Sequence, residues 1–148
     1  MSILDRITEG CTISVANEKY KVLSKVLYVT QNEPQSVYAK MILDDHNILV
    51  VSPQDEIAYF GKNEGTLPEF NQYGEKVLYN GKSYEQVNHD YQIVVGIKFG
   101  NPLDVEGEVE FWDYENDRDI ISIAVVSRNK VRADVVARYI SIDDIVIS

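Results

Sequence analysis

The residues most able to do chemistry are carboxylates gathered between residues 104 and 119. Arg118 is the one basic side chain among them. The acidic members of this segment are Asp104, Glu106, Glu108, Glu110, Asp113, Glu115, Asp117 and Asp119. In an extended strand, Glu106, Glu108 and Glu110 would share one face, with neighbours about 7 Å apart. Because like charges held so close oppose folding, this glutamate triplet requires a compensating positive charge.

Two kinds of compensation are open. A hard cation such as Ca²⁺ or Mg²⁺ takes carboxylate oxygens as ligands, which makes the glutamate triplet a candidate metal site. Alternatively, basic side chains on a neighbouring strand could form cross-strand ion pairs with it. That basic ladder is Arg128, Lys130 and Arg132. We favour the ion pairs and keep the cation site as the alternative.

An EF-hand loop is excluded, although the acidic residues from Asp113 to Asp119 alternate as they do in such a loop. Arg118 stands where the loop requires its turn glycine, and Ala124 stands where it requires a bidentate glutamate.

Other catalytic and cofactor chemistry finds little support. Cys11, His46 and His89 are too few and too scattered for a zinc site. His89 and Asp90 could in principle act as an acid–base pair, but a solvated surface histidine is the more ordinary interpretation. The chain has no nucleophile elbow, phosphate-binding loop or dinucleotide fingerprint. We therefore expect no catalytic residues and no cofactor.

Composition limits the partners. With 148 residues, 45% of them hydrophobic and 26% charged, the chain is expected to form one globular domain. Its net charge of −10 argues against binding to nucleic acid and to anionic membrane surfaces.

The single cysteine cannot form an intramolecular disulfide. The N-terminus lacks a secretory pattern, and no apolar run is long enough to cross a bilayer. These features predict a soluble, cytoplasmic protein.

Short alternating segments indicate that the chain is mostly β. Residues 2–9 are expected to form a short helix, which Ser2 caps and Gly10 ends. Asn80-Gly81 is a strong hairpin signal because both positions tolerate positive φ. Strands are expected at residues 13–15, 20–30, 37–43, 48–52, 57–60, 76–79, 83–87, 92–99, 108–112, 120–127, 131–141 and 145–147. This spacing predicts an all-β antiparallel fold, either a sandwich or a partly open barrel.

The two halves of the chain resemble each other. With Gly10 placed on Gly74, Ile13 falls on Val77, and further matches follow along the strands. We interpret this as an internal duplication, with halves at about residues 10–60 and 74–148 and a connection at about 61–73. Shared β alternation is the competing explanation. The connection and its flank hold the candidate exposed aromatic, partner-binding residues, since loops often carry function. These residues are Tyr59, Phe60, Phe70 and Tyr73.

Several motifs resemble the prokaryotic family called domain of unknown function 4178. Their positions are Gly10, residues 13–15, 20–22, 37–44, 49–52, 106–108, 111–115 and 121–123. The resemblance implies a two-part β fold and a small intracellular prokaryotic protein. It brings no established activity, so it assigns no site residue.

Taken together, these observations predict a non-catalytic binding or scaffold module whose partner is another protein, one with a basic surface. The alternative is a protein that binds a divalent cation or small ligand through the Asp104–Asp119 segment.

Overall fold

The computed structural model describes residues 2–67, 74–101 and 107–148. Helix α1 (Ile3–Arg6) comes first, and the short 3₁₀ turns η1 (Asp44–His46) and η4 (Ile142–Asp144) lie between strands. The strands are β1 (Thr12–Val15), β2 (Glu18–Thr30), β3 (Tyr38–Leu43), β4 (Asn47–Ser52), β5 (Ile57–Gly65), β6 (Lys76–Tyr79), β7 (Lys82–Phe99), β8 (Val109–Asn116), β9 (Asp119–Val126), β10 (Asp134–Ile140) and β11 (Val146–Ile147). In these ranges, no helix has the length and apolar character needed to span a membrane.

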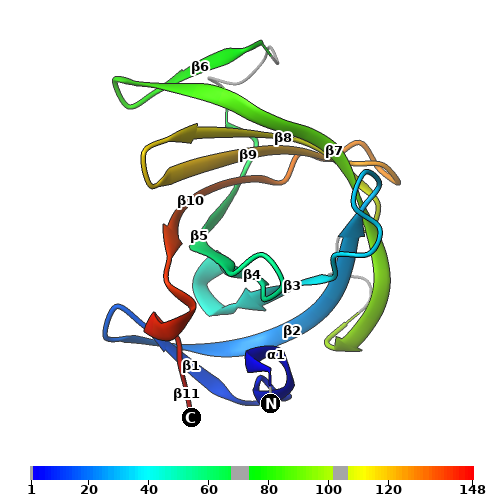
Figure 1. Ribbon diagram of the computed structural model, residues 1–148, viewed down its shortest axis with the longest axis vertical. Coiled ribbons are helices and arrows are strands. Elements are labelled where there is room, and N and C mark those ends of the chain that lie inside the picture. Colours follow the sequence, from blue (N-terminus) through cyan, green and yellow to red (C-terminus); the bar gives the residue numbers. More distant parts are fainter. Residues whose placement is uncertain (1, 68–73, 102–106) are drawn as a thin grey trace.

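Eight of the strands form a closed antiparallel barrel (Figure 1). Their order around the wall is β2, β3, β4, β5, β10, β9, β8 and β7, and β7 pairs with β2 to close the ring. The prediction of an all-β antiparallel fold with a short N-terminal helix is confirmed, but the helix ends at Arg6 and not at Gly10 as expected. The sandwich and the partly open barrel are wrong, because every wall strand has two hydrogen-bonded neighbours and no wall edge is left open.

Closure requires a long, bent strand where the sequence pattern suggested two short ones. The expected strands at 83–87 and 92–99 are one continuous strand, β7, of 18 residues. It pairs with β6, then β8, then β2, and its register with β8 shifts between Gln86 and Asn88. Strand β5 also continues to Gly65, beyond the expected end at residue 60.

The wall consists of two four-stranded meanders, β2–β5 and β7–β10, each preceded by a hairpin. Ile13 faces Tyr20 in the first hairpin, and Val77 faces Tyr84 in the second. Both hairpins turn through two residues of positive φ, at positions 16–17 and 80–81. The halves join through β2 with β7 and β5 with β10. Internal duplication stays a prediction.

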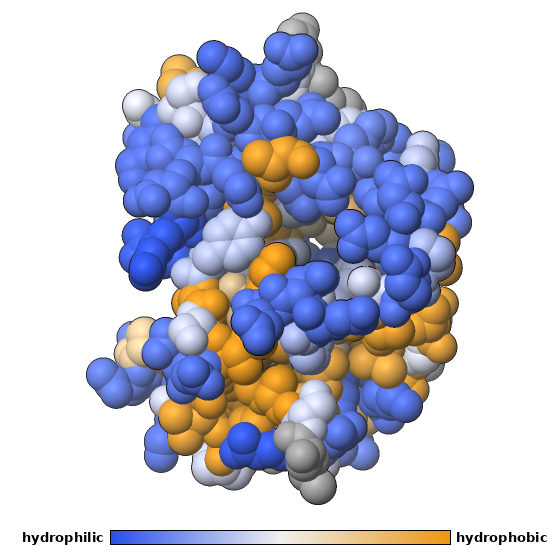
Figure 2. Space-filling model, in the orientation of Figure 1, coloured by the Kyte–Doolittle hydropathy of each residue, from blue (hydrophilic) through white to orange (hydrophobic). Residues whose placement is uncertain are grey.

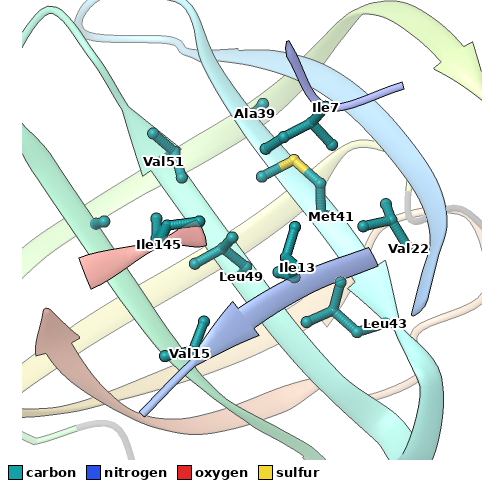
Figure 3. Packing of buried hydrophobic residues seen from close by; sticks show 11 residues of the cluster. Ile7, Ile13, Val15, Val22, Ala39, Met41, Leu43, Leu49, Val51 and Ile145 are labelled. Carbon is teal, nitrogen blue, oxygen red and sulfur yellow. The ribbon is translucent and has the colours of Figure 1, made fainter. Parts of the chain in front are cut away.

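The outer face of the first meander is covered by the N- and C-terminal segments. Figure 3 shows the resulting apolar cluster, in which side chains from β1 and the chain ends lie against β2, β3 and β4. Lys25 is buried beneath α1, where its Nζ donates hydrogen bonds to the carbonyl oxygens of Leu4 and Ile7. A second outer cluster lies under the β6–β7 hairpin, where Tyr84 packs with Tyr114. With these apolar clusters outside the wall, the barrel interior is free to hold polar groups.

Gly61 allows β5 and β10 to approach closely. A Cβ atom built on Gly61 would lie 2.1 Å from the carbonyl oxygen of Val136 and 2.4 Å from the Cα of Ala137. No L-residue with a side chain fits that space without separating the two strands, so this glycine is required for closing the wall.

Candidate functional site

The interior of the barrel holds a cavity of about 260 Å³, lined by side chains from all eight wall strands. Glu33 and Ser36 of the β2–β3 connection and Asp55 of the β4–β5 turn line one end. The space-filling view is hollowed near its centre, between these two connections as Figure 1 places them (Figure 2). Apolar side chains, including Ile48 and Ala137, pack inside the wall away from that end. The cavity therefore opens between the two connections.

Asp113 of β8 is one of the titratable groups that line the cavity. It faces Ser122 on β9 and Asn88 on β7. Burial raises the pKa of Asp113 from 3.8 to about 6; Ser122, Lys40 and Asn88 oppose that rise, and Glu115 adds to it. Among the described residues, Oδ1 of Asp113 is buried and has no hydrogen-bond partner. A buried carboxylate oxygen is thus left available to a ligand.

Gln92 of β7 supplies an unpaired donor to the same cavity. Its side chain is 5% exposed, and its Oε1 accepts a hydrogen bond from the Tyr38 hydroxyl at 3.1 Å. Its Nε2 is buried without a partner in the described part of the chain. Asp90, also 5% exposed, is by contrast satisfied, because its Oδ1 accepts from the backbone N–H groups of Asn32 and Tyr91.

The two unpaired groups lie at different levels of the barrel. Asp113 is opposite Asn88 and Gln92 is opposite Val109, so the two are four residues apart in register. At the usual rise per strand residue this separation is about 13 Å along the strands. A small ligand can therefore engage one of the two groups closely, and only an elongated ligand reaches both.

Aromatic rings form much of the remaining lining. Tyr59 and Tyr139 meet edge to face, with ring centroids 6.1 Å apart. The Tyr139 hydroxyl donates to Oε2 of Glu115 at 2.7 Å. Burial and this hydrogen bond raise the pKa of Tyr139, so the phenol stays protonated. With Tyr38 and Phe111, these rings give the cavity broad apolar faces beside its polar groups.

The predicted metal site cannot be assembled from what is described. Glu106 lies outside the described residues. Glu108 accepts a hydrogen bond from Ser127 at 3.3 Å. Glu110 accepts one from the Tyr91 hydroxyl at 3.0 Å and lies 2.9 Å from Nε2 of His89. Within residues 2–67, 74–101 and 107–148, no three His, Cys, Asp or Glu side chains are arranged to hold a metal ion. The cation site stays a prediction.

One member of the basic ladder pairs with a carboxylate outside the glutamate triplet, and pairing of the ladder with the triplet stays a prediction. Nη2 of Arg132 pairs with Oδ2 of Asp134 at 2.5 Å, and Asp134 is fully buried. Asp134 also accepts hydrogen bonds from the backbone N–H groups of Leu67 and Ala124. Lys130 lies in the β9–β10 turn with φ 60°.

The predicted aromatic surface is divided by the barrel wall. Tyr59 points into the cavity, whereas Phe60 points outward and packs on Tyr20 with ring centroids 5.0 Å apart. Consecutive strand residues face opposite sides, so these two half-buried rings cannot form one surface. Phe70 and Tyr73 lie outside the described residues.

Most of the polar residues of the cavity were not among the site residues predicted from the sequence. Lys40, Asp90 and Gln92 are each buried in a strand where a charged or amide side chain is unusual. Lys40 stands between Ala39 and Met41. An isolated charge within an apolar strand was the sequence signal that could have indicated a polar interior.

Comparisons with family models, curated proteins and solved structures found no match for this chain. The proposals below therefore depend on the cavity and surface themselves.

Proposed function

We propose that the protein binds one small organic molecule inside the barrel. The observation that carries this proposal is the cavity of about 260 Å³, which Asp113 and Gln92 line. Each of the two has a buried polar atom without a hydrogen-bond partner among the described residues. Buried polar groups in native proteins are nearly always hydrogen-bonded, so two exceptions in one cavity favour a missing partner. Closed barrels of eight strands have interiors that either fill with side chains or hold one small ligand.

The size of the cavity limits the ligand. Pockets for drug-sized molecules occupy roughly 300–1,000 Å³, and this cavity lies just below that range. We therefore expect a ligand with one ring or a short chain, held mainly by apolar contact and oriented by one or two hydrogen bonds. This proposal develops the small-ligand alternative, with Asp113 as the member of the acidic segment that serves it.

Fragment binding followed by two-dimensional NMR tests the proposal. We expect some small amphipathic fragments to shift the backbone signals of Asp113, Gln92 and their neighbours. Val50→Phe adds a ring inside the cavity and should weaken binding at least tenfold. Val95→Phe makes the same change on the outer face of β7, where Val95 is 52% exposed, and should leave binding unchanged. A library without any fragment that shifts cavity signals, or a folded Val50→Phe protein that binds normally, would contradict the proposal.

Protein binding is a second candidate, favoured by an apolar stripe on the outside of the wall. Alternate residues of β7 are exposed there, by 36% to 52%. They are Tyr91, Ile93, Val95 and Ile97. Exposed apolar patches of this kind are typical of interaction sites. Capture of a partner by the native protein but not by an Ile93→Ser, Val95→Ser variant would support it, and equal capture by both would oppose it.

A further inference from the structure

The charges that line the cavity are mostly negative. Glu33 and Asp55 are at its open end, and Asp90 and Asp113 lie within it. Lys40 is the one basic side chain among the described lining residues. Field lines concentrate in a concave site with low-dielectric walls, so four carboxylates against one ammonium attract a cation. Lys40 opposes that attraction locally, and it is outnumbered.

Asp113 is the group a cation would reach. When ionised, its carboxylate only accepts hydrogen bonds, and Oδ1 has no donor among the described residues. The groups around it are Asn88 on β7, Lys40 on β3, Ser122 on β9, Glu115 on β8 and Tyr139 on β10. Together they leave the pKa of Asp113 raised, so the protein alone does not compensate for the buried negative charge.

The aromatic lining suits the rest of such a ligand. Tyr38, Tyr59, Tyr139 and Phe111 come from four different strands and present rings to the same space. Ring faces attract organic cations through their quadrupoles and also bury an apolar body.

We infer that the ligand is a small organic ammonium, an amine on an aromatic or apolar body, whose N–H group donates a hydrogen bond to Oδ1 of Asp113. This inference rests on the proposed function of the cavity. It excludes carboxylates as preferred ligands, because these would meet four carboxylates on entry. It also makes binding depend on pH, since only the ionised form of Asp113 pairs with an ammonium.

Three matched probes separate charge from shape. They are 2-phenylethylamine, 2-phenylethanol and 3-phenylpropionate, which share a phenyl ring and differ in the polar end. By calorimetry at pH 7 we expect the amine to bind at least tenfold more tightly than the alcohol or the acid. Its affinity should fall about tenfold between pH 7 and pH 5, because Asp113 takes up a proton with a pKa of about 6. The affinity of the alcohol should not change with pH.

Variants then assign the effect to Asp113. Asp113→Asn keeps the shape of the side chain and should abolish both the preference for the amine and its pH dependence. Asp117→Asn makes the same change in the exposed β8–β9 turn and should alter neither. If the alcohol or the acid binds as tightly as the amine, or the preference survives in Asp113→Asn, the ammonium inference is overturned while the cavity remains a binding site. If none of the three probes binds, the inference is also overturned. The NMR screen of the wider fragment library then decides the proposed function separately.

Discussion

Replacing Asp113 by asparagine should stabilise the protein in a pH-dependent manner. The folded state raises the pKa of Asp113 from 3.8 to about 6 because burial disfavours the charged form. A pKa that is higher in the folded than in the unfolded state contributes stability at low pH and loses it as the pH rises through about 6. At 1.36 kcal/mol per unit of pKa, the ionised side chain costs the folded state about 3 kcal/mol at pH 8.

Asparagine has nearly the same shape and no charge, so it removes that cost. We expect Asp113→Asn to raise the free energy of unfolding by up to about 3 kcal/mol at pH 8 and to change it little near pH 3. Urea unfolding followed by circular dichroism at several pH values measures the difference between the two proteins, in which the other titrating groups cancel.

The exposed residue Asp117 provides the control. Its φ of 53° in a turn is a conformation that asparagine also tolerates, so the substitution does not strain the backbone. Because the side chain is exposed, the difference in unfolding free energy between Asp117→Asn and the native protein should not grow with pH. An Asp113→Asn protein that is no more stable than the native one at pH 8, or whose advantage is the same at every pH, would refute the reasoning. A change that stabilises the protein and also abolishes its preference for an amine is what a functional site under strain predicts.

Two further predictions concern the wall, and chemical denaturation measures both. Gly61→Ala should lower the free energy of unfolding by about 2 kcal/mol or more, because the added methyl group meets the backbone of β10. Gly96→Ala, which has open space around it, should change it by less than about 0.5 kcal/mol, and equal losses would contradict the close approach. Arg132→Met should cost about 3 kcal/mol because it removes the cation that is paired with the fully buried side chain of Asp134. Arg138→Met, which breaks an exposed ion pair, should cost less than about 1 kcal/mol, and a cost just as small for Arg132→Met would show that the Arg132 pair is not needed.

Much of the fold follows from local sequence. The turns at residues 16–17 and 80–81 require positive φ, and the alternation around them determines where each hairpin begins and ends. The N-terminal helix follows from Ser2, whose hydroxyl accepts a hydrogen bond from the Leu4 amide. These features depend on neighbours a few residues away, which is why a single sequence is enough to predict them.

Barrel closure could not be predicted in the same way. It depends on pairs such as Thr30 with Gln92 and Tyr59 with Tyr139, which are distant in sequence. Alternation in either strand is equally compatible with a sandwich, because it specifies that one face is buried and not which strand lies alongside.

The sequence by itself determined an all-β chain of short antiparallel strands, its hairpin turns, its acidic surface charge and the lack of a recognisable catalytic motif. Tertiary structure alone decided which face of each strand turns inward. In β7 that choice reverses the usual rule, because Asp90 and Gln92 face the cavity while Ile93 and Val95 face outward. The physical reason is that a closed barrel with a cavity has a second, enclosed surface, where polar side chains can be buried and still meet a partner. Asp113 became a candidate binding group for the same reason, since only the folded wall removes it from water and leaves its Oδ1 without a donor among the described residues.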